Sequence, residues 1–268
     1  MNYLTKKIKL SNGIKMPMIG FGTWQIPPGE VTYNAVMDAL DSGYIHIDTA
    51  HAYDNEKSVG EAIKDSGIDR NKLFVTSKLP SHIKDYEGAV KHFNETIKNL
   101  GFEYLDLYLI HAPWPWSEIG KDCKDGNVEV WKAMIEFYEK GLIKAIGVSN
   151  FNKDDIGYII KKTKFVPHVN QIHFHIGHNQ EETLNYCREN DILVQAYSPL
   201  GTGRILENEV IVEMAKKYQV TPAQLCIKYC LDRNTVPLPK TVTKSRMIEN
   251  SKVDFEITKE DLEILKKI

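Results

Sequence analysis

The beginning of the chain alternates between apolar and polar residues around a short turn signal. Asn12-Gly13 is a dipeptide that readily adopts positive φ, and the residues on both sides of it follow a period of two. This pattern predicts a tight β-hairpin, whose apolar positions are Ile8, Leu10, Ile14, Met16 and Met18.

From residue 19 almost to the end, short apolar runs alternate with longer segments of helical period. Thr221-Pro222-Ala223-Gln224 marks one helix start, because it combines an N-cap, a proline at the first helical position and a capping-box glutamine. The helical period is clearest at Val90, Phe93, Ile97 and Leu100 and at Trp131, Met134, Ile135 and Tyr138. The runs predicted as strands are 19–23, 44–48, 73–77, 105–110, 143–148, 168–172, 192–196 and 235–238.

Eight strands, each followed by a helix, are typical of a (β/α)8 TIM barrel, an α/β fold closed by parallel strands. An open, doubly wound sheet is the main alternative. Against it, the first strand–helix junction, Gly20-Phe21-Gly22-Thr23-Trp24-Gln25, lacks a complete GxGxxG phosphate loop. No linker, repeat or low-complexity segment interrupts the pattern. We therefore expect a single barrel domain over residues 1–268, preceded by the hairpin.

Composition narrows the classes of function. Of 268 residues, 42% are hydrophobic and 26% are charged, which is typical of a globular chain. A net charge of −2 gives no electrostatic reason to expect nucleic acid or an anionic membrane as a partner. No apolar stretch is long enough to span a bilayer, and no signal-type region follows the start. We expect a soluble, cytoplasmic protein.

The four cysteines, Cys123, Cys187, Cys226 and Cys230, form no CxxC pair. Cys226 and Cys230 lie four residues apart in a predicted helix, so they share a face on which a metal could bind. We favour the interpretation that they are small buried side chains.

Ionisable residues stand where three consecutive predicted strands end. Asp48 closes the second strand and Tyr53 follows it, Lys78 ends the third, and His111 follows the fourth. In a barrel, catalytic groups come from this end of the strands. Each residue alone is more typical of a solvated, salt-bridged or packed side chain, but together they form a chemical unit.

This unit can give a proton to a carbonyl oxygen as it becomes an alkoxide. The reference pKa of tyrosine, about 10, is too high for efficient acid–base catalysis at neutral pH. We expect the Lys78 ammonium to favour the phenolate and so to lower the pKa of Tyr53. Asp48 would keep the lysine charged and oriented, and His111 would hydrogen-bond the reacting oxygen.

Along nearly its whole length the chain resembles the aldo-keto reductase family. Any one shared motif would be weak evidence, but so many in order are highly specific. The motifs are Gly22-Thr23-Trp24, Asp48-Thr49-Ala50-His51-Ala52-Tyr53, Thr76-Ser77-Lys78-Leu79, Leu109-Ile110-His111, Gly147-Val148-Ser149-Asn150-Phe151, Val169-Asn170-Gln171, Tyr197-Ser198-Pro199-Leu200-Gly201 and Leu238-Pro239-Lys240-Thr241.

The resemblance implies that Asp48, Tyr53, Lys78 and His111 form a catalytic tetrad, with Tyr53 as the general acid in reduction and a nicotinamide as the hydride source. It also implies contacts to the carboxamide, to the face of the nicotinamide ring and to the pyrophosphate. Ser149, Asn150 and Gln171 would contact the carboxamide, and Tyr197 would stack on the face of the ring. Ser198, Leu200 and Gly201 would lie along the pyrophosphate, with Gly22 and Thr23 beside the cofactor.

The segment after the last strand bears on cofactor choice. Lys240, Thr241 and Arg246 match the family's contacts to the adenosine 2′-phosphate, and Glu249 and Asn250 match its adenine contacts. Two cations and a hydroxyl suit a dianionic phosphate, which arginine can bind in bidentate fashion. A solvated basic helix start would be unusual, because helix N-termini favour negative groups. We expect NADPH rather than NADH.

Three features depart from the family pattern. His173 stands where many relatives have a glutamate, and with His175 and His178 it offers a metal-like cluster, although we place no carboxylate or water partner for a metal and expect none.

Ala112 stands where relatives often carry a bulky aromatic residue, so Trp114 or Trp116 could rebuild that wall of the substrate pocket beside His111, or could simply pack in the loop. Trp24 matches a pocket-wall position more securely. The sequence ends at Ile268, soon after the last predicted helix, and from this we expect an open pocket with weak selectivity for small aldehydes and ketones.

The leading hypothesis is an NADPH-dependent carbonyl reductase, a monomer that takes small carbonyl compounds. A regulatory subunit that uses the same fold as a redox sensor, and a metal-dependent hydrolase built on the histidine cluster, remain as alternatives. Fold alone does not decide among them.

Overall fold

The computed structural model describes residues 2–268. Its first two strands form the N-terminal hairpin. Strand β1 (Lys7–Lys9) pairs antiparallel with β2 (Lys15–Pro17). Between them, Leu10 N donates to Ile14 O at 2.8 Å, and Gly13 has a φ of 91°. The left-handed position requires glycine, so the predicted hairpin is confirmed.

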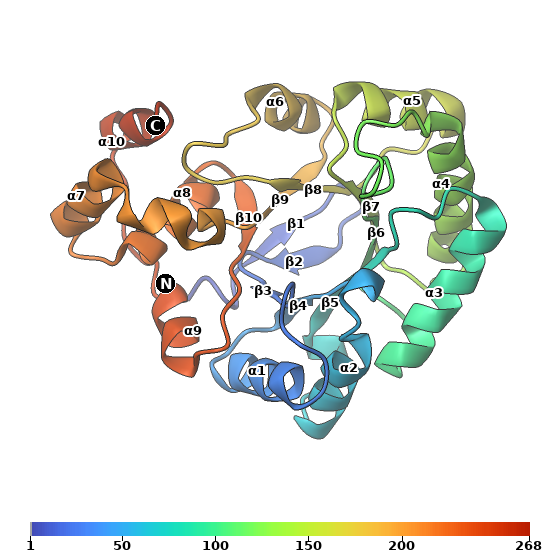
Figure 1. Cartoon of the computed structure of the whole chain (residues 1–268), viewed down its shortest axis with the longest axis horizontal. Coiled ribbons are helices and arrows are strands. Elements are labelled where there is room, and N and C mark those ends of the chain that lie inside the picture. Colours follow the sequence, from blue (N-terminus) through green and yellow to red (C-terminus); the bar gives the residue numbers. More distant parts are fainter. Residues whose placement is uncertain (1) are drawn as a thin grey trace.

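Eight parallel strands form the second sheet, and their order in space follows the chain (Figure 1). Each predicted run overlaps one strand. This order confirms the barrel and excludes the doubly wound alternative, in which the strand order would reverse. The strands are β3 (Phe21–Gly22), β4 (His46–Asp48), β5 (Phe74–Leu79), β6 (Leu107–Ile110), β7 (Ile146–Ser149), β8 (Val169–His173), β9 (Leu193–Tyr197) and β10 (Thr235–Leu238).

The barrel closes between the first and last of these strands. Gly20 N donates to Pro237 O and Gly22 N donates to Pro239 O, both at 3.0 Å. A Cβ on Gly22 would lie 3.1 Å from Leu238 O. Glycine therefore lets the two edges approach closely enough for backbone hydrogen bonds.

Helices surround the strands (Figure 1). The predicted capping box is present, since Thr221 Oγ1 accepts from Gln224 N while Gln224 Oε1 accepts from Thr221 N. The helices are α1 (Glu30–Asp41), α2 (Glu56–Asp65), α3 (Tyr86–Leu100), α4 (Lys124–Glu139), α5 (Lys153–Thr163), α6 (Glu181–Glu189), α7 (Glu209–Tyr218), α8 (Pro222–Asp232), α9 (Lys244–Asn250) and α10 (Lys259–Leu265), with 3-10 turns η1 (His51–Tyr53), η2 (Arg70–Lys72) and η3 (Gly201–Glu207).

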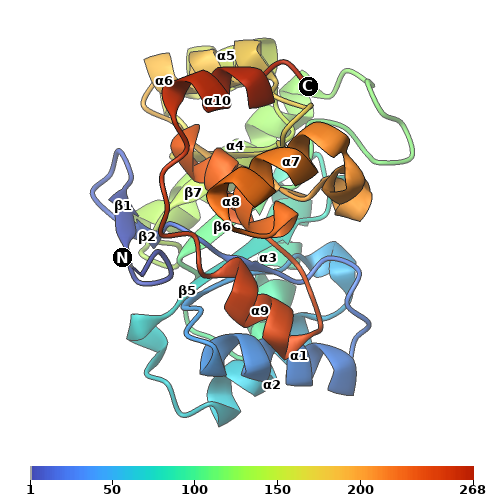
Figure 2. The same cartoon turned by 90° about the vertical axis from the view of Figure 1, so that its left-hand side faces the viewer.

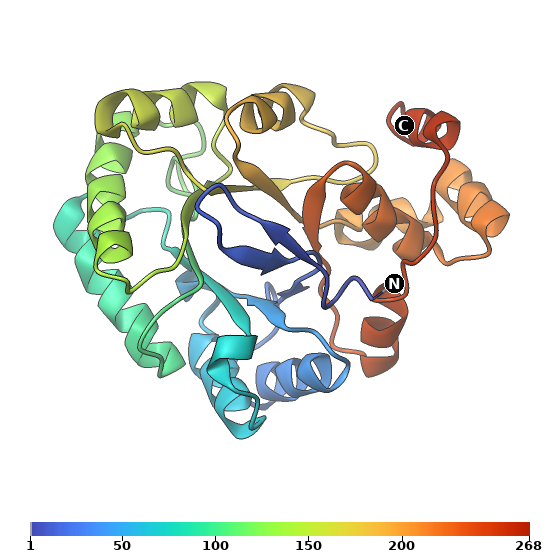
Figure 3. The ribbon, with the colours of Figure 1, turned by 180° about the vertical axis from the view of Figure 1, so that it is seen from behind.

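The hairpin covers one end of the barrel. Seen from behind, it crosses the barrel mouth, and from the side it lies at the edge of the molecule (Figures 2 and 3). Its Leu10 and Met16 pack with residues from inside the barrel, including Phe74, Leu107 and Val236. The opposite end, where the strands terminate, is left for the site. None of the helices in residues 2–268 is long and apolar enough to cross a membrane.

Candidate active site

Three consecutive strands bring Asp48, Tyr53, Lys78 and His111 together. Lys78 Nζ donates to Asp48 Oδ1 at 2.5 Å, to Thr49 O at 2.8 Å and to the Tyr53 hydroxyl at 3.4 Å. The rings of Tyr53 and His111 meet edge to face, with centroids 5.5 Å apart. The lysine therefore links the carboxylate to the phenol.

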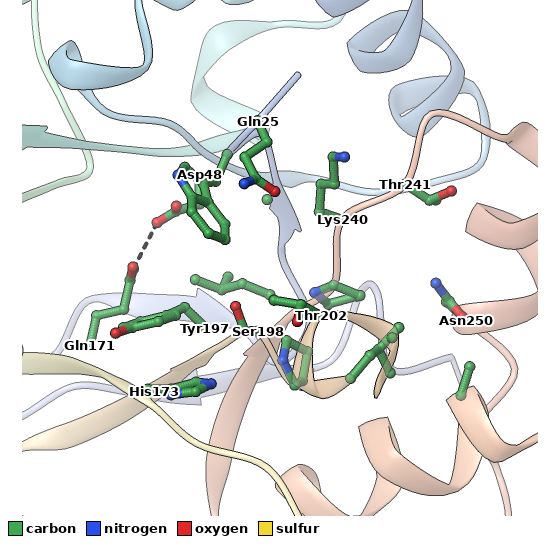
Figure 4. A pocket seen from close by; sticks show the side chains of 18 of the residues that line it. Gln25, Asp48, Gln171, His173, Tyr197, Ser198, Thr202, Lys240, Thr241 and Asn250 are labelled. Carbon is green, nitrogen blue, oxygen red and sulfur yellow. Dashed lines mark hydrogen bonds between the residues drawn. The ribbon is translucent and has the colours of Figure 1, made fainter. Parts of the chain in front are cut away.

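A chain of amides supports Asp48 from inside the barrel. Gln171 Nε2 donates to Asp48 Oδ2 at 2.8 Å (Figure 4). It also donates to Gln195 Oε1 at 2.9 Å. Each carboxylate oxygen of Asp48 thus has its own donor. Gln195 is a residue that the sequence reasoning missed, because no local signal connects β9 to Asp48.

The pKa of Tyr53 shifts in the direction opposite to our expectation. Burial, together with the nearby Asp48 charge, raises the pKa of Tyr53 well above its ordinary value. Lys78 is fully buried, and burial lowers its pKa although Asp48 acts in the other direction. The expected lowering of the Tyr53 pKa was wrong, because burial of the phenol, with the nearby Asp48 charge, raises that pKa. Tyr53 therefore rests as the protonated acid.

His111 is neutral at physiological pH. Burial and the Lys78 charge lower the pKa of His111 to about 3. Its Nδ1 atom is buried and has no hydrogen-bond partner within residues 2–268. The neutral imidazole keeps one N–H and can donate a hydrogen bond to a bound oxygen, but it is not an acid that transfers a proton at neutral pH.

A cavity of about 1040 Å³ opens above these residues. It runs from the catalytic end, where Asp48, Gln171 and His173 lie, to a far end with Thr241 and Asn250 (Figure 4). Of the residues expected at the site, those lining it are Gly22, Trp24, Asp48, Tyr53, His111, Ser149, Asn150, Gln171, Tyr197, Ser198, Leu200, Lys240, Thr241, Arg246, Glu249 and Asn250.

The cavity wall formed by β7 to β9 is held by its own hydrogen bonds. Tyr197 donates to Asn150 Oδ1 at 2.8 Å, and Asn150 Nδ2 donates to His111 O at 3.0 Å. His173 stacks on Tyr197, with centroids 5.3 Å apart and planes at 8°. One face of the tyrosine ring is thus covered, and hydrogen bonds within the wall hold the Tyr197 hydroxyl and the Asn150 amide in place.

The comparisons with known proteins agree with this geometry. The model of the Aldo/keto reductase family matches residues 18–268. The chain belongs to the aldo-keto reductase family. A Bacillus subtilis glyoxal reductase is 38% identical over 261 residues, covering 97% of this chain and 91% of that protein. A 9,11-endoperoxide prostaglandin H2 reductase of Trypanosoma cruzi is 39% identical over 259 residues, covering 95% and 88%.

Solved structures share the fold at similar identity. An aldo/keto reductase from Brucella melitensis superposes with a TM-score of 0.91 at 38% identity, covering 98% of this chain and 99% of that one. An aldo-keto reductase from a deep-sea metagenome library, MGS-M4, gives 0.90 at 40% identity, covering 97% and 94%. This chain is thus an oxidoreductase of a family that generally uses nicotinamide cofactors.

In this aldo-keto reductase, four expected site residues lie off the cavity surface. Lys78 lies beneath it, Thr23 is buried with its hydroxyl on Asp48 O at 3.0 Å, and Gly201 is buried at the start of η3. Trp114 was expected to line the substrate pocket. The structure gives that place to Trp116, on which Trp114 packs with ring centroids 4.9 Å apart.

The far end of the cavity presents two cations. Within residues 2–268, no carboxylate lies within 4.0 Å of Lys240 or Arg246, and both are exposed. Lys244, between them in the sequence, is instead held by Asp38 at 3.0 Å and Asp41 at 3.2 Å. The sequence analysis named Lys240 and Arg246 but not Lys244, and it missed Arg204, which also lines the cavity.

The structure brings the three histidines of the predicted cluster together. The rings of His173, His175 and His178 lie with centroids 4.6 to 5.7 Å apart. Even so, no group of three or more His, Cys, Asp or Glu side chains in residues 2–268 is arranged to hold a metal ion. Burial and the neighbouring charges lower the pKa of His173 to about 4.

Proposed function

We propose that this aldo-keto reductase uses NADPH to reduce small aldehydes, ketones and dicarbonyls to alcohols, with Tyr53 as the proton donor. The observation that carries the proposal is the contact of Lys78 with both Asp48 and the Tyr53 hydroxyl at the base of the cavity. The unpaired Lys240 and Arg246 at the other end support the choice of cofactor.

The residues present fit a phosphorylated dinucleotide. The residues that line the cavity offer amide and hydroxyl groups at one end and cations at the other. Ser149, Asn150 and Tyr197 would hold the nicotinamide, while Lys240 and Arg246 would hold the 2′-phosphate. When bound, the cofactor supplies hydride, which no side chain can provide.

The proton comes from Tyr53. Because its pKa is raised, the phenol is fully protonated before reaction and donates as negative charge develops on the carbonyl oxygen. The phenolate so formed lies beside the Lys78 ammonium, which stabilises it. Neutral His111 orients the oxygen. One hydride and one proton convert the carbonyl to an alcohol.

The catalytic end suits small substrates of broad structure. Trp24 and Trp116 line it and are 46% and 45% exposed, so the wall there is apolar and open. We further propose that residues 1–268 act as one unit, as a cytoplasmic monomer. All the proposed groups come from one chain, and its four free cysteines suit a reducing compartment.

The test is the loss of NADPH absorbance with a panel of aldehydes, ketones and dicarbonyls, with NADH run in parallel. Tyr53→Phe removes only the acidic hydroxyl, so we expect NADPH affinity to persist while kcat falls by about 10³-fold. Retained turnover in Tyr53→Phe contradicts the proposed role. Tight NADPH binding by the wild type without turnover would favour the redox-sensor alternative instead.

A further inference from the structure

Trp116 lines the cavity from an irregular loop. Residues 111–123 connect β6 to α4 without a helix or strand of their own. The Trp116 ring lies edge-on to His111, with centroids 5.9 Å apart, and nearly half of its surface is exposed. Packing of the half-exposed ring alone therefore does not hold Trp116 in this position, and we look for contacts of the loop backbone that do so.

Two side chains from other elements hold the start of this loop. Lys84 Nζ donates to Ala112 O at 2.8 Å and to Asn127 Oδ1 at 2.7 Å. Asn127 Nδ2 donates to Pro113 O at 2.8 Å. The two carbonyls that follow His111 are thus bound by the loop after β5 and by the first turn of α4.

A third contact acts on Trp116 itself. The buried Ser81 Oγ accepts from Trp116 N at 3.2 Å. Trp114 then packs edge to face on the Trp116 ring. The backbone is therefore held at residues 112, 113 and 116, which leaves the Trp116 side chain little freedom to leave the cavity.

A lysine is an unusual residue to hold a loop from a partly buried position, because burial disfavours its charged form. No carboxylate lies within 4.0 Å of Lys84 in residues 2–268, and burial lowers its pKa to about 8. Asp155 and Cys123 act on it only at longer range. A partly buried cation held by neutral oxygens is hard to explain by stability alone. The three donors on its flexible side chain can instead hold two neighbouring groups in place.

We propose that Lys84 and Asn127 are positioning residues that hold Trp116 in place, so that the site selects aromatic aldehydes over small aliphatic dicarbonyls. The proposal rests on the carbonyl reduction proposed above. An aromatic substrate gains a ring contact from a fixed indole, whereas a compound such as methylglyoxal has no ring to make that contact.

The kinetic test compares 4-nitrobenzaldehyde with methylglyoxal. Lys84→Met keeps an unbranched side chain only one atom shorter but removes its donors, so we expect the ratio of the two kcat/KM values to fall about tenfold, through KM for the aromatic substrate. Trp116→Ala should lower the same ratio. The double variant should show no further fall, because both changes remove one contact. Additive losses, or equal losses with both substrates, would overturn the proposal.

Two further measurements guard against a variant that merely fails to fold. Ser81→Ala leaves Lys84 in place and should lower the ratio of the two kcat/KM values by a smaller factor. In 5-fluorotryptophan-labelled protein, Lys84→Met should move or broaden the ¹⁹F resonance of Trp116, assigned with Trp116→Phe, and leave that of buried Trp131 unchanged. If the Trp116 resonance does not move, Lys84 does not position Trp116, whether or not the enzyme is active. Absence of carbonyl reduction by the wild type would instead refute the proposed function.

Discussion

Arg246 and Lys244 offer a matched test of cofactor choice. Both are exposed, lie on α9 and carry one positive charge, but only Arg246 lines the cavity. Lys244 is already bound by Asp38 and Asp41 of α1. Changing each to methionine removes the same charge from the same short helix.

The magnitude follows from the exposure of these side chains. A hydrogen bond to a charged group contributes roughly 1.5–3 kcal/mol, and solvent screening places an exposed guanidinium at the lower end. A loss of about 1.4 kcal/mol is tenfold in affinity. Arg246→Met should therefore weaken NADPH binding about tenfold and leave NADH binding unchanged. Lys244→Met should change neither by more than about twofold.

The assay is fluorescence titration of each variant with NADPH and with NADH, at low and at high ionic strength. The NADPH preference of the wild type should shrink as salt rises, because exposed charges are screened. Equal weakening of NADPH and NADH in Arg246→Met, or an equal loss in Lys244→Met, would show that the 2′-phosphate does not bind where we place it.

Three other outcomes are expected. Asp48→Asn removes the charge that raises the Lys78 pKa, so the alkaline loss of kcat/KM should begin at lower pH, and a pH profile unchanged in position argues against the pairing. Gly22→Ala places a Cβ 3.1 Å from Leu238 O where the barrel closes, and should lower the free energy of unfolding by roughly 1–3 kcal/mol in urea titrations. Burial lowers the pKa of His46 to about 3 from its ordinary 6.5. The unfolded chain then binds more protons between those values, so stability should fall as pH drops below 6.5, and less so in His46→Gln.

Much of the architecture was predictable because it depends on neighbours along the chain. Alternation around Asn12-Gly13 is enough to specify a hairpin, and the change from period two to helical period marks each strand and helix. Parallel strands bring their carboxyl ends to one rim, so Asp48, Lys78 and His111 had to converge once the barrel was predicted.

Tertiary structure alone decided how these groups affect one another. Gln171 lies 123 residues from Asp48 in the chain, yet it supplies the donor for the second carboxylate oxygen. The direction of the Tyr53 pKa shift depends on the burial of the phenol and on the charge of Asp48 close to it. Neither quantity has a local signature in the sequence.

Contacts between distant residues also decide which side chains line the two ends of the cavity. Trp114 and Trp116 are two residues apart on a loop without periodicity. Contacts made by Lys84, Asn127 and Ser81 from other elements hold the loop so that Trp116 lies in the wall. Lys244 is bound by Asp41 of α1, which lies 203 residues away in the chain. Sequence period determines which elements form, whereas the pairing of side chains across elements is determined only when they pack, because those contacts join residues that are distant in the chain.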